Sequence, residues 1–326
     1  MGTTSDPNVP DVRLYELAFD QFSRQYLVKS LIEKARSKTK LRILDVGGLG
    51  GKTREFFPND NVLVIDLYDK TETNYQKADA LAMPFADHSF DFVVSFDVYE
   101  HILPADRPLF VTELIRVSRQ VVFIAAPFNT QSVESTENEL NAFYRSLHDK
   151  DHPWLAEHIA NILPEMEPLE KQLDSLGMSY SVSSSNNLLL WSHMQGLIFL
   201  ADSLSAPERL SKLNSFYNQH LLEMGDGLGA SYRQIYAISK NIKTLPNIQN
   251  TMSLNDDTLR SFINLTAITI RDIVYGSGET GSQAAELAKK DRELTELRSK
   301  LEGINASRPY KLARSITKAK NRVFPK

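Results

Sequence analysis

The sequence contains no cysteine among its 326 residues. This absence excludes disulfide bonds and thiolate metal sites, and it fits a reducing compartment. Segment 1–20 has acids and prolines where a signal peptide would carry a basic and then an apolar stretch. No run approaches the roughly 18–20 apolar residues of a membrane span. We therefore predict a cytoplasmic globular protein, and its 42% hydrophobic residues are ordinary for that class.

Acidic residues are missing from segment 303–326, which carries seven of the 37 lysines and arginines. The whole chain has a net charge of −4, so residues 1–302 alone carry −11. The basic tail is therefore electrostatically separate from an acidic body.

Four short apolar runs in the first half predict buried strands, and a helical pattern such as that of 108–118 separates the later ones. Buried strands that alternate with helices indicate a parallel, doubly wound α/β sheet. Amphipathic spacing over 11–36 predicts one or two helices in front of the first run. The four runs are 41–48, 62–67, 90–96 and 120–128.

The second half predicts a helical insertion followed by two more strands. Helical patterns cover 136–149, 153–163, 165–176, 188–203 and 207–223, with strands at 178–185 and 231–240. Gly177 is expected to cap the third of these helices. We predict a Rossmann-like seven-stranded domain over 1–240, with an acceptor lid within about 130–225. A helical extension and linker (241–282) and a short coiled coil with a basic tail (283–326) would follow.

A glycine-rich loop follows the first predicted strand and points to a ligand site. Gly47, Gly48, Gly50 and Gly51 remove the side chains that would keep a ligand from the backbone. The next helix would direct free N–H groups at the ligand. Asp66 ends the second apolar run about 20 residues further on, where an acid can accept both protons of a ribose diol. In a doubly wound sheet, ligands are expected to bind in the crevice at the carboxyl ends of the strands, where this loop and Asp66 would lie.

Other ligand classes fit this loop less well. A phosphate loop of an NTPase would need glycine at position 46, which is Val46. A nicotinamide dehydrogenase would need glycine where Leu49 or Thr53 stands. A third alternative is a non-catalytic protein of the same fold, which acts as a structural or interaction partner.

The segment ADALAMPFADHSFDFVVSFDVYEHI (78–102), with ILDVGG and VLVIDL before it, resembles the UbiE-like, or type 11, group of class I methyltransferases. The likeness covers 43–102 in order and spacing, and a weaker one extends to about residue 240. It implies S-adenosylmethionine as the cofactor and methyl transfer as the reaction. The loop departs from the family pattern at Leu49, where the family has glycine. By this resemblance the cofactor-binding residues would be Asp45, Gly47, Gly48, Gly51, Asp66, Asp79, Ala80 and Phe96.

Methyl transfer is an in-line displacement, so alignment supplies much of the catalysis. A hydroxyl acceptor would also need a base, for which His101 and Asp97 are the candidates beyond the third core strand. In the insertion, His152, Trp154 and His158 are expected to contact the acceptor. His148, Asp149 and Asp151 lie among them, but the spacing matches no strong metal motif, so we predict no metal site.

The acceptor is expected to be a small molecule or a glycan. The tail segment SRPYKLARSITKAK (307–320) is similar to tails of bacterial enzymes that build surface polysaccharides, which implies a glycan hydroxyl and a possible glycosyltransferase partner. A quinone, a lipid or another metabolite is the alternative acceptor. The basic tail could also dock on the inner membrane face, whereas nucleic acid suits the acidic body poorly. The C-terminal helix could support a homo-oligomer.

Overall fold

The computed structural model describes residues 12–49, 52–222, 229–242, 244–248 and 255–276. The chain divides into two units, Met1–Ile270 and Arg271–Lys326. The sheet and the candidate site belong to the first unit. The predicted coiled coil and basic tail (283–326) lie outside the described residues, as do parts of the predicted extension and linker.

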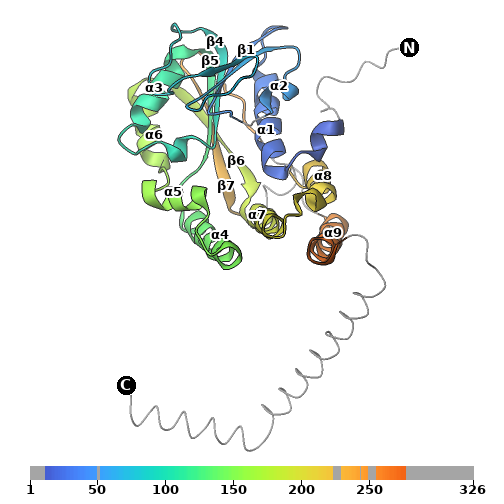
Figure 1. Cartoon of the computed structure of the whole chain (residues 1–326). Helices are drawn as coiled ribbons and strands as arrows, with labels where there is room; N and C mark the ends of the chain where they lie inside the picture. Colours follow the sequence, from blue (N-terminus) through green and yellow to red (C-terminus); the bar gives the residue numbers. More distant parts are fainter. Residues whose placement is uncertain (1–11, 50–51, 223–228, 243, 249–254, 277–326) are drawn as a thin grey trace, which may run out of the picture. The chain divides into compact units, whose positions relative to one another are not determined.

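A seven-stranded sheet in the order β3-β2-β1-β4-β5-β7-β6 forms the centre of the first unit (Figure 1). Strands β1 to β5 are parallel, and β7 runs antiparallel to both of its neighbours. The predicted α/β doubly wound class is confirmed. The strands are β1 (Arg42–Val46), β2 (Asn61–Asp66), β3 (Tyr75–Lys77), β4 (Phe90–Phe96), β5 (Ser118–Pro127), β6 (Ser179–Asn187) and β7 (Ser231–Ser239).

The predicted apolar runs form the central strands, which are covered on both faces. Every residue of β4 is buried, and so are the last four residues of β1. Such continuous burial is typical of parallel strands between two helical layers. Strand β3 was not predicted: its three residues at the sheet edge are partly or fully exposed, and it therefore leaves no apolar run in the sequence.

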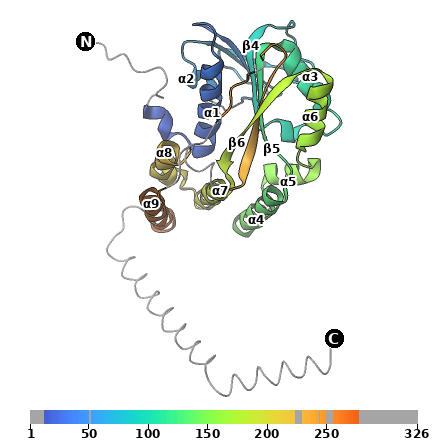
Figure 2. The ribbon, with the colours of Figure 1, turned by 180° about the vertical axis from the view of Figure 1, so that it is seen from behind.

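Helices cover both faces of the sheet (Figures 1 and 2). Helices α1 (Phe19–Ala35) and α2 (Thr53–Phe56) lie on one face, and α3 (Arg107–Val117) and α6 (Met166–Ser175) lie on the other. Gly177 follows α6 with φ of 64°, a left-handed conformation that glycine adopts readily, as the predicted cap requires.

The predicted insertion forms a helical layer next to the carboxyl ends of the parallel strands. It consists of α4 (Gln131–His148), α5 (Pro153–Asn161), α7 (Leu188–Ser203) and α8 (Ser211–His220), with α4 packed against α7. The 3-10 helix η3 (Pro207–Leu210) precedes α8, and η1 (Val12–Glu16) precedes α1. We call α4 and α5 the lid. Helix α9 spans Asp256–Tyr275, and its Thr266 and Phe262 contact His193 of α7.

Candidate functional site

Four acidic side chains lie at the carboxyl ends of neighbouring parallel strands or just after them. Asp45 is the last residue but one of β1, Asp66 ends β2, Asp79 follows β3 and Asp97 follows β4. Since parallel strands end at one edge of the sheet, residues far apart in the sequence come together there. They surround a cavity of about 600 Å³, which Asp66, Asp79 and Asp97 line directly.

The turn after β1 passes so close to its surroundings that glycine is required twice. Gly47 has φ of 77°, and a Cβ atom there would overlap the side chain of Val98. A Cβ atom at Gly48 would overlap the carboxylate of Asp45. The Gly47 N–H donates to the carbonyl oxygen of Ile65 at 2.8 Å, which ties the turn to β2. The loop therefore presents bare backbone to the cavity, while Gly51 lies outside the described residues.

Asp45 lies beneath this loop rather than on the cavity wall. Its carboxylate is 4% exposed and is hydrogen-bonded to the hydroxyl of Thr53, which also lies 2.6 Å from Gln25 Oε1. Burial raises the pKa of Asp45 to about 6, against the lowering effects of Thr53 and Arg24. The side chain holds the loop against α2, and its predicted direct contact with a cofactor stays a prediction.

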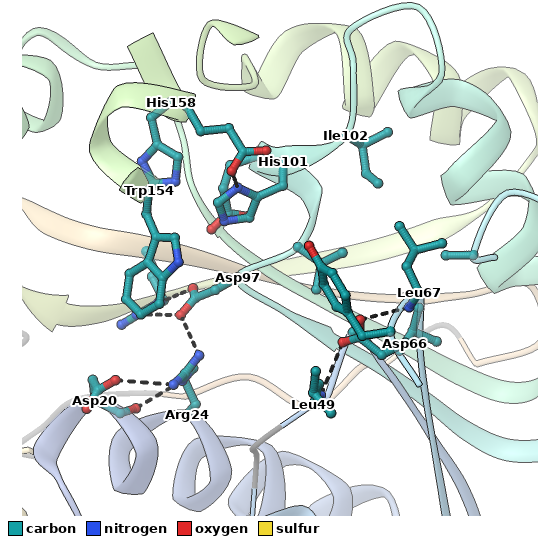
Figure 3. Close-up of a pocket in the computed structure, with 18 of the residues that line it drawn as sticks. Asp20, Arg24, Leu49, Asp66, Leu67, Asp97, His101, Ile102, Trp154 and His158 are labelled. Carbon is teal, nitrogen blue, oxygen red and sulfur yellow. Dashed lines mark hydrogen bonds and ion pairs between the residues drawn. The ribbon is translucent and has the colours of Figure 1, made fainter. Parts of the chain in front are cut away.

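Asp66 points into the cavity from the end of β2, opposite the lid (Figure 3). Its Oδ1 accepts the N–H of Leu67 at 2.8 Å, and its Oδ2 accepts the N–H of Leu49 at 3.3 Å. Each carboxylate oxygen keeps further acceptor capacity. Asp79 and Ala80 line the same end of the cavity beyond β3. Phe96, in contrast, is a buried residue of β4 and is not among the side chains that line the cavity.

Asp97 is held by two arginines at the base of the cavity. Arg233 of β7 donates to both of its oxygens, from Nε to Oδ1 and from Nη2 to Oδ2, the latter at 2.6 Å. Nη1 of Arg24 in α1 lies 3.3 Å from Oδ2 (Figure 3). Burial alone would raise the pKa of Asp97, but the two guanidinium groups hold it below its ordinary value. A carboxylate with both oxygens in an ion pair is a poor proton acceptor. The geometry therefore favours a positioning role for Asp97.

Two histidines meet where η2 (Tyr99–His101) faces the lid. The rings of His101 and His158 have centroids 5.0 Å apart. His101 Nδ1 lies 3.1 Å from Glu157 Oε2, and burial with the neighbouring His158 lowers the pKa of His101. A neutral imidazole at the cavity wall can accept a proton.

The buried His158 pairs with Glu137 of α4. Its Nδ1 lies 2.9 Å from Glu137 Oε1, which also accepts the hydroxyl proton of Tyr232 at 2.8 Å. His152 and Trp154 line the cavity from the start of α5. The indole of Trp154 is 59% exposed, whereas Trp191 is buried and stacked on Tyr232. The lid residues predicted from the sequence thus reach the cavity, where His101 joins them.

The sequence did not reveal the polar groups that surround these residues. Arg233 lies in a predicted strand, and Arg24 lies in a helix that was predicted from the spacing of its apolar residues. Glu137 lies in a polar helix. Nothing local distinguishes these three from surface charges, since only the fold brings α1, α4 and β7 to the cavity.

Residues 44–125 match a protein family described as a methyltransferase domain. The matched segment runs from β1 to β5 and includes Asp66, Asp79 and Asp97. This match agrees with the enzyme class predicted from the sequence over that segment. A comparison with curated protein sequences gave no match.

Solved structures with a similar fold include a phosphoethanolamine N-methyltransferase of Haemonchus contortus in complex with S-adenosylmethionine. It is 17% identical, with a TM-score of 0.43 over 70% of this chain and 56% of that one. The YcgJ protein of Bacillus subtilis is 16% identical, with a TM-score of 0.38 over 65% and 97%. The plantazolicin methyltransferase BpumL in complex with S-adenosylhomocysteine is 14% identical, with a TM-score of 0.43 over 69% and 85%. Likeness at this level carries no information on the acceptor.

Proposed function

We propose that the protein transfers a methyl group from S-adenosylmethionine to a hydroxyl group of a small molecule or glycan. The observation that carries this proposal is a single cavity with two chemically different ends. One end has the bare loop at Gly47 together with the Asp66 carboxylate, and the other has His101 and the lid. Such a cavity can hold a cofactor and an acceptor side by side.

The residues at the first end suit S-adenosylmethionine. The tight turn at Gly47 and Gly48 leaves backbone accessible that a Cβ atom would cover. Asp66 offers acceptor oxygens for a ribose diol, and Asp79 with Ala80 lies where the adenine would follow. Arg24, which pairs with Asp20 and Asp97, also lines the cavity and would donate to the carboxylate of the methionine part. When bound, the cofactor supplies a methyl group activated by its sulfonium.

The residues at the second end suit an acceptor that must lose a proton. The acceptor oxygen would form a bond to the methyl carbon while the bond from that carbon to sulfur breaks, and the hydroxyl proton would pass to the ring of His101. Glu157, 3.1 Å from Nδ1, would stabilise the imidazolium that results. The exposed indole of Trp154 offers a flat apolar surface, on which a sugar or another ring can stack.

A glycan is the preferred acceptor class, supported by Trp154 and by the likeness of segment 307–320 to tails of polysaccharide-building enzymes. A quinone, lipid or other metabolite acceptor is the alternative within the same reaction. A non-catalytic partner in a glycan-assembly complex is the alternative outside it.

Calorimetric titration with S-adenosylmethionine tests the cofactor end. We expect Asp66→Ala to weaken binding by about 10–100-fold, since a hydrogen bond to a charged group contributes about 1.5–3 kcal/mol. The matched control is Asp69→Ala, which removes an exposed carboxylate three residues away whose partner is Lys77. This control is expected to bind like the wild type.

Absence of binding in the wild type would contradict the enzyme function and leave the non-catalytic alternative. If the wild type binds, release of S-adenosylhomocysteine in the presence of nucleotide-linked and lipid-linked sugars then tests the acceptor class. Turnover only with quinones or lipids would contradict the glycan proposal but not the reaction.

A further inference from the structure

A group of three potential metal ligands lies at the lid end of the cavity. Glu100, His101 and His158 each offer one ligand atom, and these atoms lie within 4.8 Å of one another. Glu100 and His101 come from η2, and His158 comes from α5, so two separate elements supply the group. Figure 3 shows His101 and His158 on the same side of the cavity, above Asp97.

The buried members of this group have unused polar atoms. Glu100 is 1% exposed, and its Oε2 has no hydrogen-bond partner within the described part of the chain. His158 is 5% exposed, and its Nε2 also has no partner among the described residues. An unpaired buried polar atom is costly, so two of them in residues whose ligand atoms lie within 4.8 Å of one another call for a common partner.

His158 is oriented as metal-binding histidines are. Its Nδ1 lies 2.9 Å from Glu137 Oε1, a contact that in the neutral ring favours the proton on Nδ1 and leaves the lone pair of Nε2 free. The hydroxyl of Tyr232 fixes Glu137 in turn. A carboxylate behind the imidazole sets the tautomer and makes the second nitrogen a better ligand.

We propose that Glu100, His101 and His158 bind a divalent transition-metal ion, with Zn²⁺ as the best match. Two imidazoles and one carboxylate with a fourth position open to solvent are a ligand set that zinc uses in catalytic sites. Tetrahedral zinc at its usual bond lengths keeps its ligands about 3.3 Å apart, so small side-chain rotations would close the site. Mg²⁺ prefers oxygen ligands and does not suit it.

The site itself does not depend on the proposed methyl transfer, but its role in the reaction does. An ion in this position would bind the acceptor oxygen and lower the pKa of its hydroxyl group. His101 would then be a ligand, and the bound oxygen would release its proton to solvent. This role would explain why two histidines and a buried acid gather at the acceptor end.

Titration of the tag-free full chain with Zn²⁺, followed by calorimetry and by the visible absorption of Co²⁺ in the same site, tests the proposal. One ion should bind per chain, with release of protons and with no comparable binding of Mg²⁺. Glu137→Gln should weaken Zn²⁺ binding by about 10–100-fold, as loss of a carboxylate behind a histidine ligand does. Glu100→Gln should weaken it at least as much while keeping the side-chain shape.

The matched control is His220→Ala, which removes an exposed histidine at the end of α8 and should leave Zn²⁺ binding unchanged. Circular dichroism of each variant separates loss of the site from loss of the fold. Equal binding by the wild type, Glu100→Gln and Glu137→Gln would overturn the proposal, as would the lack of a stoichiometric ion in the wild type. Titration of the wild type with S-adenosylmethionine, with and without Zn²⁺, tests the proposed function separately.

Discussion

At the scale of single residues, the site depends on ionisable side chains that are buried although their charged forms are more stable in water. Asp45 is the example with a measurable consequence, because it is an acid enclosed beneath the glycine turn. The Thr53 hydroxyl and the field of Arg24 favour its charged form, but burial outweighs them. The folded protein therefore holds the Asp45 proton more tightly than the unfolded chain does.

This difference predicts a pH-dependent effect of Asp45→Asn. Between pH 4 and 6 the unfolded chain loses a proton that the folded protein retains, since the pKa of Asp45 rises from 3.8 to about 6. The contribution of Asp45 thus lowers the wild-type free energy of unfolding as pH rises. We expect the free energy of unfolding of the variant to increase relative to that of the wild type as pH rises over this range, by at most about 3 kcal/mol. Urea denaturation at several pH values measures it, and a difference independent of pH would contradict the prediction.

At the scale of elements, one ion-pair cluster connects three parts of the fold. Asp97 after β4 binds Arg233 of β7 and Arg24 of α1, and Arg233 also donates to Asn186 at 3.1 Å. Arg233 is 4% exposed, so its charge has little access to water. The cluster fixes the base of the cavity relative to the N-terminal helix and the last strand.

Arg233→Met should therefore lower the free energy of unfolding by about 3–5 kcal/mol, because the buried Asp97 then loses its bidentate partner and keeps the longer contact with Arg24. The double variant with Asp97→Asn should recover part of this loss, since both charges are then gone. Lys171→Met is the control: its ion pair with Glu167 is exposed, and such pairs contribute about 0–1 kcal/mol. Equal stability of Arg233→Met and Lys171→Met in urea would contradict the structural role of the cluster.

At the scale of the whole molecule, the basic tail is expected to bind partners that the acidic body would repel. None of the helices in the described ranges is long and apolar enough to cross a membrane. Residues 303–326 carry seven bases and no acid, and we propose that they dock on anionic lipid headgroups or on an acidic partner enzyme.

Replacement of Lys311, Arg314, Lys318 and Lys320 by alanine in the full chain should reduce binding to vesicles that contain anionic lipid. Each lysine or arginine near such a surface contributes about 1 kcal/mol, so the affinity for the vesicles should fall by more than 100-fold at low salt. Co-sedimentation with anionic and neutral vesicles at two salt concentrations measures it. Substitution of Lys34, Lys52, Lys70 and Lys171 by alanine on the body is the control for net charge. Equal loss in both variants would show that the tail is not a docking segment.

The sequence by itself determined the order and type of nearly all central elements. The four apolar runs predicted β1, β2, β4 and β5, because a strand covered on both faces must be apolar throughout. The glycines at 47 and 48 and the acid at 66 marked the turn and the second strand end, since a tight turn and a strand terminus each leave a local signal. The edge strand β3 left none, and it was missed.

Only the tertiary structure decided which polar groups meet at the cavity. Arg24, Glu137 and Arg233 are separated by long stretches of sequence, and each resembles a surface charge when it is considered alone. Likewise, the spacing of the histidines in the insertion suggested no metal site, whereas the fold brings His158 to Glu100 and His101. Patterns along the chain report burial and local conformation, but the partner of a buried charge is set by the packing of distant elements.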